Sequence, residues 1–173
     1  MFTNDAALAE IFKMIANHGQ KTRYYHEIVG CNSRLDSIQA AILNVKLPLL
    51  DGYIEKRRAA ADYYDRAFAG QSKIRTPHRA PYTRHVFHQY TLIVEGADRN
   101  KLNEWLASKN IPSMIYYPVA AHRQKMFSVF GSASQPLDVT DWLTEHVISL
   151  PMHTELDEEQ LSFISNAVLE FLN

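Results

Sequence analysis

Apolar residues recur at intervals of three and four near the start of the chain, and this spacing predicts an amphipathic helix. Over 4–17 the apolar positions are Leu8, Ile11, Phe12 and Ile15. Asn4 or Asp5 can cap this helix, and Gly19 can end it. From 20 to 33 no period is sustained, which predicts an extended loop.

The helical period returns after Asp36, which can cap a second helix. The stripe expected to be buried consists of Ile38, Ala41, Ile42 and Val45. Pro48 lacks an N–H, so this helix should end or kink near Lys46. A third helix is predicted from Asp51 to about Ala69.

The third helix has an apolar and a charged face. Its buried stripe should include Ile54, Ala61 and Phe68. The charged residues Glu55, Arg58, Asp62 and Arg66 stand three and four positions apart, where they can pair. This charged face is expected only to meet solvent.

The composition changes after the third helix. Prolines and scattered basic residues predict a linker over 71–84. Alternation rich in aromatic and β-branched residues predicts a strand over 87–94, and Asp98 can cap a helix that runs through Leu106. A second strand is predicted over 111–117. Together these elements would form a β-α-β unit.

The remaining elements complete a small α/β fold. Short helices are predicted over 122–130 and 136–146, and a third strand over 147–150 ends before Pro151. Asp157 and Gln160 form a capping-box pattern before a last helix. We expect a helical segment over 1–70, a linker over 71–84 and a small α/β domain over 85–173. In that fold long helices precede a short sheet with helices packed on one face of it.

Composition limits the partners and the compartment. The chain has 18 Lys and Arg residues against 19 Asp and Glu residues, so no basic field favours nucleic acid or an acidic membrane. Its single cysteine, Cys31, excludes an internal disulfide and fits a reducing compartment. No stretch approaches the roughly 20 apolar residues of a membrane span. We expect a soluble, cytoplasmic protein with no nucleic-acid partner and no membrane partner.

Candidate chemistry concentrates at the Gly-Cys-Asn-Ser-Arg turn of 30–34, directly before the second helix. Asn32 and Arg34 can hold phosphate oxygens, because arginine offers a rigid donor fork and a helix N-terminus adds backbone N–H groups. The competing interpretation is an ordinary turn with Arg34 in solvent.

Other reactive residues give weaker patterns. His85 and His88 stand three positions apart, and on a strand they would point to opposite faces, so no metal site is expected. None of the eight lysines lies in an apolar, pocket-forming motif, so no catalytic residue is nominated.

The chain resembles the DegT/DnrJ/EryC1/StrS family of sugar aminotransferases, which use pyridoxal 5'-phosphate on nucleotide-linked keto sugars. Besides the 30–43 segment, the resemblance rests on His18-Gly19-Gln20, Tyr25-His26-x-x-x-Gly30, Arg57, Tyr63-Tyr64, His85-Val86-Phe87-His88-Gln89-Tyr90, Ile115-Tyr116-Tyr117-Pro118, His122-x-Gln124 and Ser149-Leu150-Pro151-Met152-His153. These motifs follow the family's order and cover nearly the whole chain.

The resemblance implies that the chain is the C-terminal part of such an enzyme, including the small domain of an aspartate-aminotransferase-like fold. The large domain, which carries the lysine that binds the cofactor, would be missing or supplied by another chain. The chain alone is therefore expected to be inactive. The implied reaction transfers an amino group, commonly from glutamate, to a keto sugar nucleotide in surface-polysaccharide or related sugar biosynthesis.

The resemblance also implies roles for individual residues. Asn32 and Arg34 lie in the loop that, in the family's homodimer, reaches the cofactor phosphate of the other subunit. The residues implied to face the substrate are Tyr25, His26, His88, Tyr116, Tyr117, His122 and Gln124. Alternation along the predicted strand would instead place either Tyr116 or Tyr117 in the core.

Two other functions are open on sequence alone. The chain could be a non-catalytic module that binds sugar nucleotides or regulates another protein. It could also be a truncated fragment whose apolar surface drives self-association.

Overall fold

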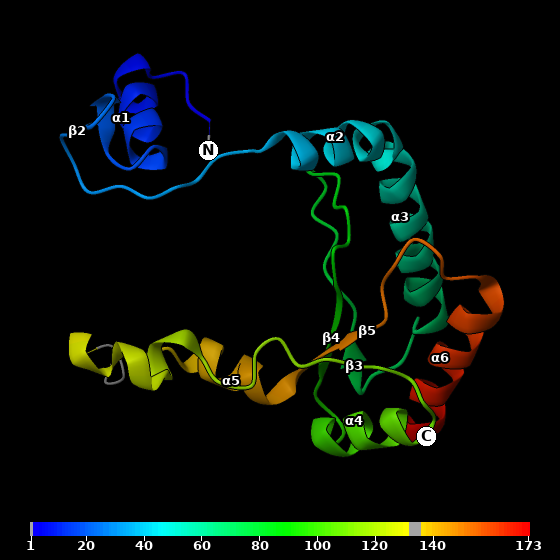
Figure 1. Cartoon of the computed structure of the whole chain (residues 1–173). Coiled ribbons are helices and arrows are strands. Elements are labelled where there is room, and N and C mark those ends of the chain that lie inside the picture. Colours follow the sequence, from blue (N-terminus) through cyan, green and yellow to red (C-terminus); the bar gives the residue numbers. More distant parts are fainter. Residues whose placement is uncertain (1, 132–135) are drawn as a thin grey trace. The chain divides into compact units, whose positions relative to one another are not determined.

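The computed structural model describes residues 2–131 and 136–173, which form two compact units, Met1–Leu50 and Asp51–Asn173 (Figure 1). The helical segment predicted over 1–70 includes residues 51–70. In the structure these residues belong to the second unit.

The first unit contains helices α1 (Ala6–Ala16) and α2 (Ser37–Lys46), followed by the 3-10 turn η1 (Leu47–Leu49). Both predicted caps are confirmed. The carboxylate of Asp5 accepts hydrogen bonds from the N–H groups of Ala7 and Leu8, and that of Asp36 accepts one from Gln39. A short carboxylate side chain can satisfy these otherwise unpaired N–H groups at each helix start.

A small hairpin occupies the segment predicted as an extended loop. Strand β1 (Gln20–Thr22) pairs antiparallel with β2 (Tyr25–His26), and Tyr24 at the turn has a φ of 73°. Strands this short carry too few residues for a detectable period, which is why the prediction of a loop over 20–33 was incomplete.

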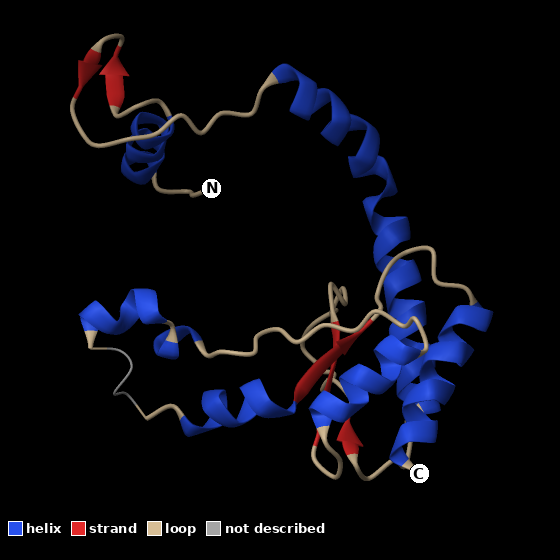
Figure 2. Ribbon diagram, turned by 60° about the horizontal axis from the view of Figure 1, so that its bottom comes forward, coloured by secondary structure: helices blue, strands red, loops and turns tan. Residues whose placement is uncertain are grey.

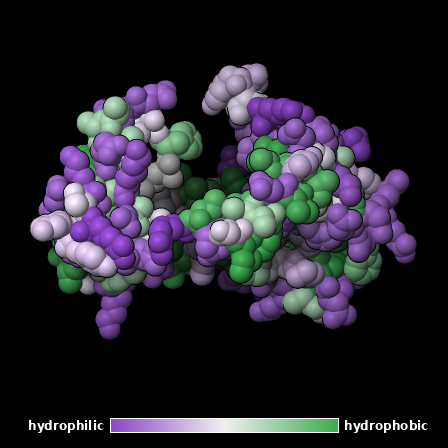
Figure 3. Space-filling view, turned by 45° about the horizontal axis from the view of Figure 1, so that its top comes forward, coloured by the Kyte–Doolittle hydropathy of each residue, from purple (hydrophilic) through white to green (hydrophobic). Residues whose placement is uncertain are grey.

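The expected burial of the α2 stripe is wrong. Ile38, Ile42 and Val45 are 76%, 54% and 72% exposed, and no residue of α2 is buried. The apolar period identifies one face of the helix correctly, but burial needs a facing surface, and the described part of this unit supplies none. Hydrophobic side chains are visible among hydrophilic ones at the molecular surface (Figure 3).

The second unit is built on helix α3 (Leu50–Ala67) and a three-stranded antiparallel sheet. The strands are β3 (Ile74–Arg75), β4 (Tyr90–Val94) and β5 (Val147–Leu150), in that spatial order. The other elements are α4 (Arg99–Ser108), the 3-10 turns η2 (Ala121–Arg123) and η3 (Lys125–Phe130), α5 (Asp138–His146) and α6 (Glu158–Leu172).

The core lies between this sheet and the helices beside it (Figure 2). Tyr90, Leu92 and Val94 alternate along β4 and are each fully buried, as the period of a strand requires. They belong to one hydrophobic cluster with residues of α3, α4 and α6, including Tyr64 and Leu106. The predicted mixed α/β fold, with helices packed on a short sheet, is confirmed.

Local signals located most elements of this unit. Asp98 caps α4, and Asp157 forms the full capping box with Gln160 at the start of α6. Over 121–130 the chain forms two 3-10 turns rather than the predicted helix.

The predicted β-α-β unit is wrong. The segment 111–117 is not a strand and contributes a single antiparallel bridge between Met114 and Ser149. The nitrogen of Met114 lies 3.0 Å from the carbonyl oxygen of Ser149, and the nitrogen of Ser149 lies 2.7 Å from that of Met114. Pro112 has no N–H to donate to a ladder, and Pro118 ends the segment. The strands paired with β4 are therefore β3 and β5, and the sheet is antiparallel throughout.

The charged face of α3 does more than meet solvent. Nη2 of Arg79 lies 2.7 Å from Asp62 and 2.6 Å from Asp65, and Arg84 pairs with Glu55. This face therefore holds part of the segment 71–84 that the sequence predicts as a linker. Burial works to lower the pKa of Arg79, but the hydrogen bond and charge of Asp65, together with Asp62, leave it raised.

Candidate functional site

The loop that carries Asn32 and Arg34 is tied to the end of α1. The N–H of Cys31 donates to the carbonyl of Ile15 at 2.8 Å, and the N–H of Ser33 donates to that of Ala16 at 2.9 Å. The end of α1 leaves carbonyl groups without partners in the helix, and the returning chain satisfies them. The loop is thus held in place by backbone contacts next to the start of α2.

Two glycines make this close return possible. At Gly30 an added Cβ would lie 2.2 Å from the backbone nitrogen of Gly19 and 2.7 Å from the carbonyl oxygen of Ile15. Gly19 has a φ of 76°, a conformation in which side chains are strained, and an added Cβ there would lie 1.7 Å from the oxygen of Ile28. A side chain at either position would force the two segments apart.

Asn32 orients the guanidinium of Arg34. Its Oδ1 accepts a hydrogen bond from Nε of Arg34 at 3.0 Å. Within the described part of the chain, the two terminal nitrogens of Arg34 have no hydrogen-bond partner. Both residues line an open groove of about 490 Å³ with Leu35, Asp36 and Ser37. Donors held at a helix start suit an anion, and the Asp36 carboxylate is engaged in capping α2.

Tyr25 and His26 lie on β2 of the same unit, and both are exposed. Nδ1 of His26 is 2.7 Å from the carbonyl oxygen of His18, so Nδ1 carries the proton. In the neutral ring Nε2 is then the acceptor, and Nε2 lies 3.4 Å from the Gln20 amide nitrogen. The hairpin therefore holds the imidazole in one tautomer.

The other predicted residues lie in the second unit. His88 is exposed, in the loop just before β4 rather than on the predicted strand. Tyr116 is half-buried and Tyr117 is 70% exposed, with their rings edge to face and 5.6 Å apart. Both tyrosines line a cavity of about 250 Å³ whose other walls are mostly aliphatic residues of 119–147.

His122 is directed towards α5 and not towards the tyrosine cavity. Its Nε2 lies 3.4 Å from Oδ1 of Asp141, and the same carboxylate accepts from Arg123 at 3.0 and 2.5 Å. The hydrogen bond from Arg123 is the main cause that holds the pKa of Asp141 below its ordinary value. Gln124 is exposed at the end of η2.

The structure thus brings the predicted residues together in three places. Asn32 joins Arg34 at the groove before α2, Tyr25 joins His26 on the hairpin, and Tyr116 joins Tyr117 at the cavity. His88 lies apart from the tyrosine cavity lining, as do His122 and Gln124.

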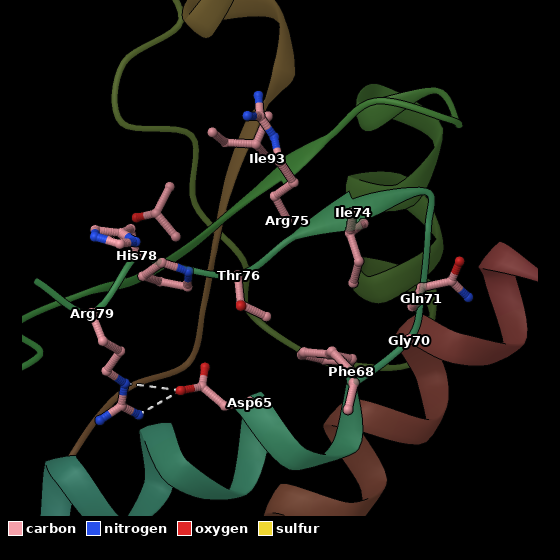
Figure 4. A pocket seen from close by; sticks show the side chains of 13 residues that line it. Asp65, Phe68, Gly70, Gln71, Ile74, Arg75, Thr76, His78, Arg79 and Ile93 are labelled. Atoms are coloured by element: carbon pink, nitrogen blue, oxygen red, sulfur yellow. Dashed lines mark hydrogen bonds and ion pairs between the residues drawn. The ribbon is translucent and has the colours of Figure 1, made fainter.

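A larger open cavity, of about 760 Å³, involves none of the predicted site residues. It lies between the end of α3, β3, β4 and the segment 76–79 (Figure 4). The guanidinium of Arg79 is turned towards Asp65 there, with Nε donating to Oδ2 at 2.9 Å, so its charge is already neutralised. Sequence reasoning missed this cluster, because its partners lie 14 positions apart in the chain.

The described residues contain no group of three or more His, Cys, Asp or Glu side chains placed to hold a metal ion. None of the helices within 2–131 and 136–173 is both long and apolar enough to cross a membrane.

Comparisons with known proteins agree on one family. A protein of Geobacillus stearothermophilus named "Pleiotropic regulatory protein" is 40% identical over 173 residues, which cover 99% of this chain and 46% of that protein. The UDP-N-acetyl-3-dehydro-alpha-D-glucosamine 3-aminotransferase of Acidithiobacillus ferrooxidans is 38% identical over 171 residues, which cover 99% of this chain and 45% of that protein.

A solved structure is similar over the same extent. The crystal structure of DesV from S. venezuelae in complex with a ketimine intermediate has a TM-score of 0.86 and 33% identity, covering 99% of this chain and 46% of DesV. The chain thus spans about half the length of the relatives it matches. The model of the DegT/DnrJ/EryC1/StrS aminotransferase family matches residues 1–169. The chain is therefore a member of the DegT/DnrJ/EryC1/StrS aminotransferase family.

Proposed function

We propose that this chain is the C-terminal part of a pyridoxal-phosphate-dependent nucleotide-sugar aminotransferase that works as a homodimer. The observation that carries the proposal is the pair formed by Asn32 and Arg34, with the Arg34 donors held beside the open groove before α2. The relatives that are named as sugar aminotransferases support it, as does the extent of the match.

The groove residues fit a phosphate monoester. The terminal nitrogens of Arg34 form a planar fork that matches two phosphate oxygens, and the Asn32 amide can donate a third hydrogen bond. Pyridoxal phosphate, when bound, supplies the electron sink that amino-group transfer requires. The part of Asn32 and Arg34 is to bind and orient its phosphate.

Aromatic residues of the chain would recognise the sugar nucleotide. Tyr117 is exposed beside a mostly aliphatic cavity, so its ring can stack on a sugar or a base while its hydroxyl donates to a polar group. Tyr25 presents a second aromatic ring and hydroxyl on the hairpin, beside His26, whose Nδ1 is held by the His18 carbonyl. The donor substrate we propose is an amino acid, commonly glutamate, and the acceptor is a nucleotide-linked keto sugar.

The first test is the chain's own reaction with the cofactor. The purified chain is incubated with pyridoxal phosphate, reduced with borohydride and analysed by intact mass and peptide mapping. We expect scattered labelling well below one adduct per chain among the eight lysines. A single stoichiometric adduct on one lysine would show that this chain builds the lysine site itself, contrary to the proposal.

The second test addresses the phosphate contact. The chain is mixed with a partner fragment that carries the family's lysine domain, and transamination is measured against pyridoxal phosphate concentration. Arg34→Gln should weaken the apparent cofactor affinity at least tenfold, because it removes a charge-assisted pair of hydrogen bonds. Arg23→Gln, an equal loss of charge in the same unit, is the matched control and should change it less than twofold.

A regulatory or binding role without catalysis is the second candidate, and the name of the Geobacillus stearothermophilus relative favours it. It predicts saturable binding of a UDP-sugar by the isolated chain and no turnover with any lysine-bearing fragment. Turnover in the mixture would exclude this second candidate.

A further inference from the structure

Arg57 on α3 ties together two loops that are far apart in the sequence. Its Nη1 lies 3.0 Å from the carbonyl oxygen of Met152, 3.3 Å from that of His88 and 3.4 Å from that of Phe87. One guanidinium nitrogen thus serves three backbone acceptors. The acceptors belong to the loop before β4 and the loop after β5.

These two loops leave the sheet at the same end. Tyr90, the first residue of β4, pairs with Leu150, the last residue of β5, and the two strands are antiparallel. The residues just before Tyr90 and just after Leu150 therefore lie side by side. His88 is on one loop, and His153 is on the other.

The backbone beside His88 is strained. Phe87 has a φ of 47°, which is rare for a bulky side chain. Such a conformation persists only where the surroundings determine it. Here the Phe87 side chain is 2% exposed, its N–H donates to Nδ1 of His85 at 2.9 Å, and its carbonyl accepts from Arg57.

Neighbouring side chains of α3 hold one loop each. Nη1 of Arg58 donates to the carbonyl of His85 at 2.9 Å, and the hydroxyl of Tyr64 donates to that of Pro151 at 3.1 Å. Among the hydrogen bonds described for α3, those of Arg57 are the ones that reach both loops.

We propose that Arg57 is a positioning residue: it joins the two loops at this end of the sheet and so holds in one place His88, which the family resemblance implies to face the substrate. The role of His88 rests on the proposed function, whereas the tie between the loops rests on the contacts of Arg57 alone. The guanidinium of Arg57 donates hydrogen bonds to backbone carbonyl groups that lie outside the strands and so have no partner in the sheet.

The test measures local order in the full chain by NMR. Arg57→Met keeps the aliphatic stem and removes every donor, whereas Arg57→Lys keeps the charge and supplies three N–H donors on a side chain of shorter overall reach. The matched control is Arg66→Met, the same substitution on the same helix. Arg66 is exposed, and its side chain has no hydrogen bond or ion pair within the residues described.

Backbone order parameters of His88, Gln89 and Met152 should be near 0.85 in the unmodified chain and below about 0.6 in Arg57→Met. Leu92 and Ile148, inside the strands, should stay near 0.85. Arg57→Lys should restore most of the loop order, and Arg66→Met should match the unmodified chain. Should Arg57→Met not fold, Arg57→Leu, which also removes every donor, takes its place with the same expectation.

Two results would overturn the proposal. Loops that stay rigid in Arg57→Met would show that the tie is dispensable. An equal loss of order at Leu92 and Ile148 would show that Arg57 only stabilises the unit as a whole.

A second measurement separates this proposal from the proposed function. The dissociation constant of UDP-N-acetylglucosamine should rise about tenfold in Arg57→Met and less than threefold in Arg57→Lys. An unchanged constant in Arg57→Met would mean that the tie does not position His88 for the ligand. No binding by the unmodified chain would count against the proposed sugar recognition, and the order parameters alone would then decide the role of Arg57.

Discussion

Replacing Tyr90 with phenylalanine removes one buried hydroxyl from the first residue of the central strand and leaves the ring in place. That hydroxyl donates to Oδ1 of Asp65 at 2.6 Å, and the Tyr90 side chain is fully buried. Burial first, and the bond to Asp65 second, raise the pKa of Tyr90. The phenol therefore stays a donor throughout the neutral pH range.

The magnitude follows from the charge of the acceptor. A hydrogen bond to a charged group contributes about 1.5–3 kcal/mol, and a bond between neutral groups about 0.5–1.5 kcal/mol. The Asp65 side chain is 28% exposed and keeps its ion pair with Arg79, so solvent and Arg79 compensate part of the loss. We expect Tyr90→Phe to lower the free energy of unfolding by about 1.5–2 kcal/mol.

Tyr64→Phe is the matched comparison. Tyr64 is equally buried, but its hydroxyl donates to the neutral carbonyl of Pro151 at 3.1 Å. Tyr64→Phe should therefore lower the free energy of unfolding by about 0.5–1.5 kcal/mol, less than Tyr90→Phe does.

Urea unfolding measures both variants. The two tryptophans, Trp105 and Trp142, lie in the second unit, so their fluorescence reports the unit that contains Tyr64 and Tyr90. With a slope of about 2 kcal/mol per M, Tyr90→Phe should move the midpoint down by roughly 0.7–1 M. Equal shifts for the two variants, or a larger one for Tyr64→Phe, would refute the argument from acceptor charge.

Three further predictions concern the same unit. Leu106→Ala should cost about 2–5 kcal/mol in urea unfolding because Leu106 is fully buried, and a loss below 1 kcal/mol would contradict the assigned core. Asp157→Ala should lower the free energy of unfolding by about 1 kcal/mol through loss of the α6 cap, whereas Asp157→Asn should change it by only a few tenths of a kcal/mol. Equal losses in the two variants would contradict the capping role. Because Arg123 lowers the pKa of Asp141, this carboxylate contributes stability above its ordinary pKa of 3.8, and the contribution disappears as pH falls through the folded-state value. The free energy of unfolding should therefore fall less at acid pH in Asp141→Asn than in the unmodified chain. An equal fall in both would contradict the pairing of Asp141 with Arg123.

Prediction succeeded where the decisive interactions are local. The N-caps Asp5, Asp36 and Asp98 were readable because a capping side chain bonds to an N–H two or three residues later. Alternation along β4 was readable because it follows from strand geometry alone.

Prediction failed where a partner decides the outcome. The stripe of α2 was recognised as apolar, but whether it is buried depends on a surface that the sequence period does not describe. The segment 111–117 has strand-like composition, yet it joins the sheet by one bridge. The charge pattern of α3 predicts a face that meets only solvent, whereas Arg79 and Arg84 return to that face from the segment 71–84.

The sequence by itself determined the helix starts, the central strands, the family motifs and the candidate pair Asn32 and Arg34, because each depends on residues within a few positions of one another. The tertiary structure alone decided that β4 lies between β3 and β5, and that Arg57 joins two loops 30 and 95 positions away. Contacts at such separations depend on how the elements pack, and no local period or cap encodes them.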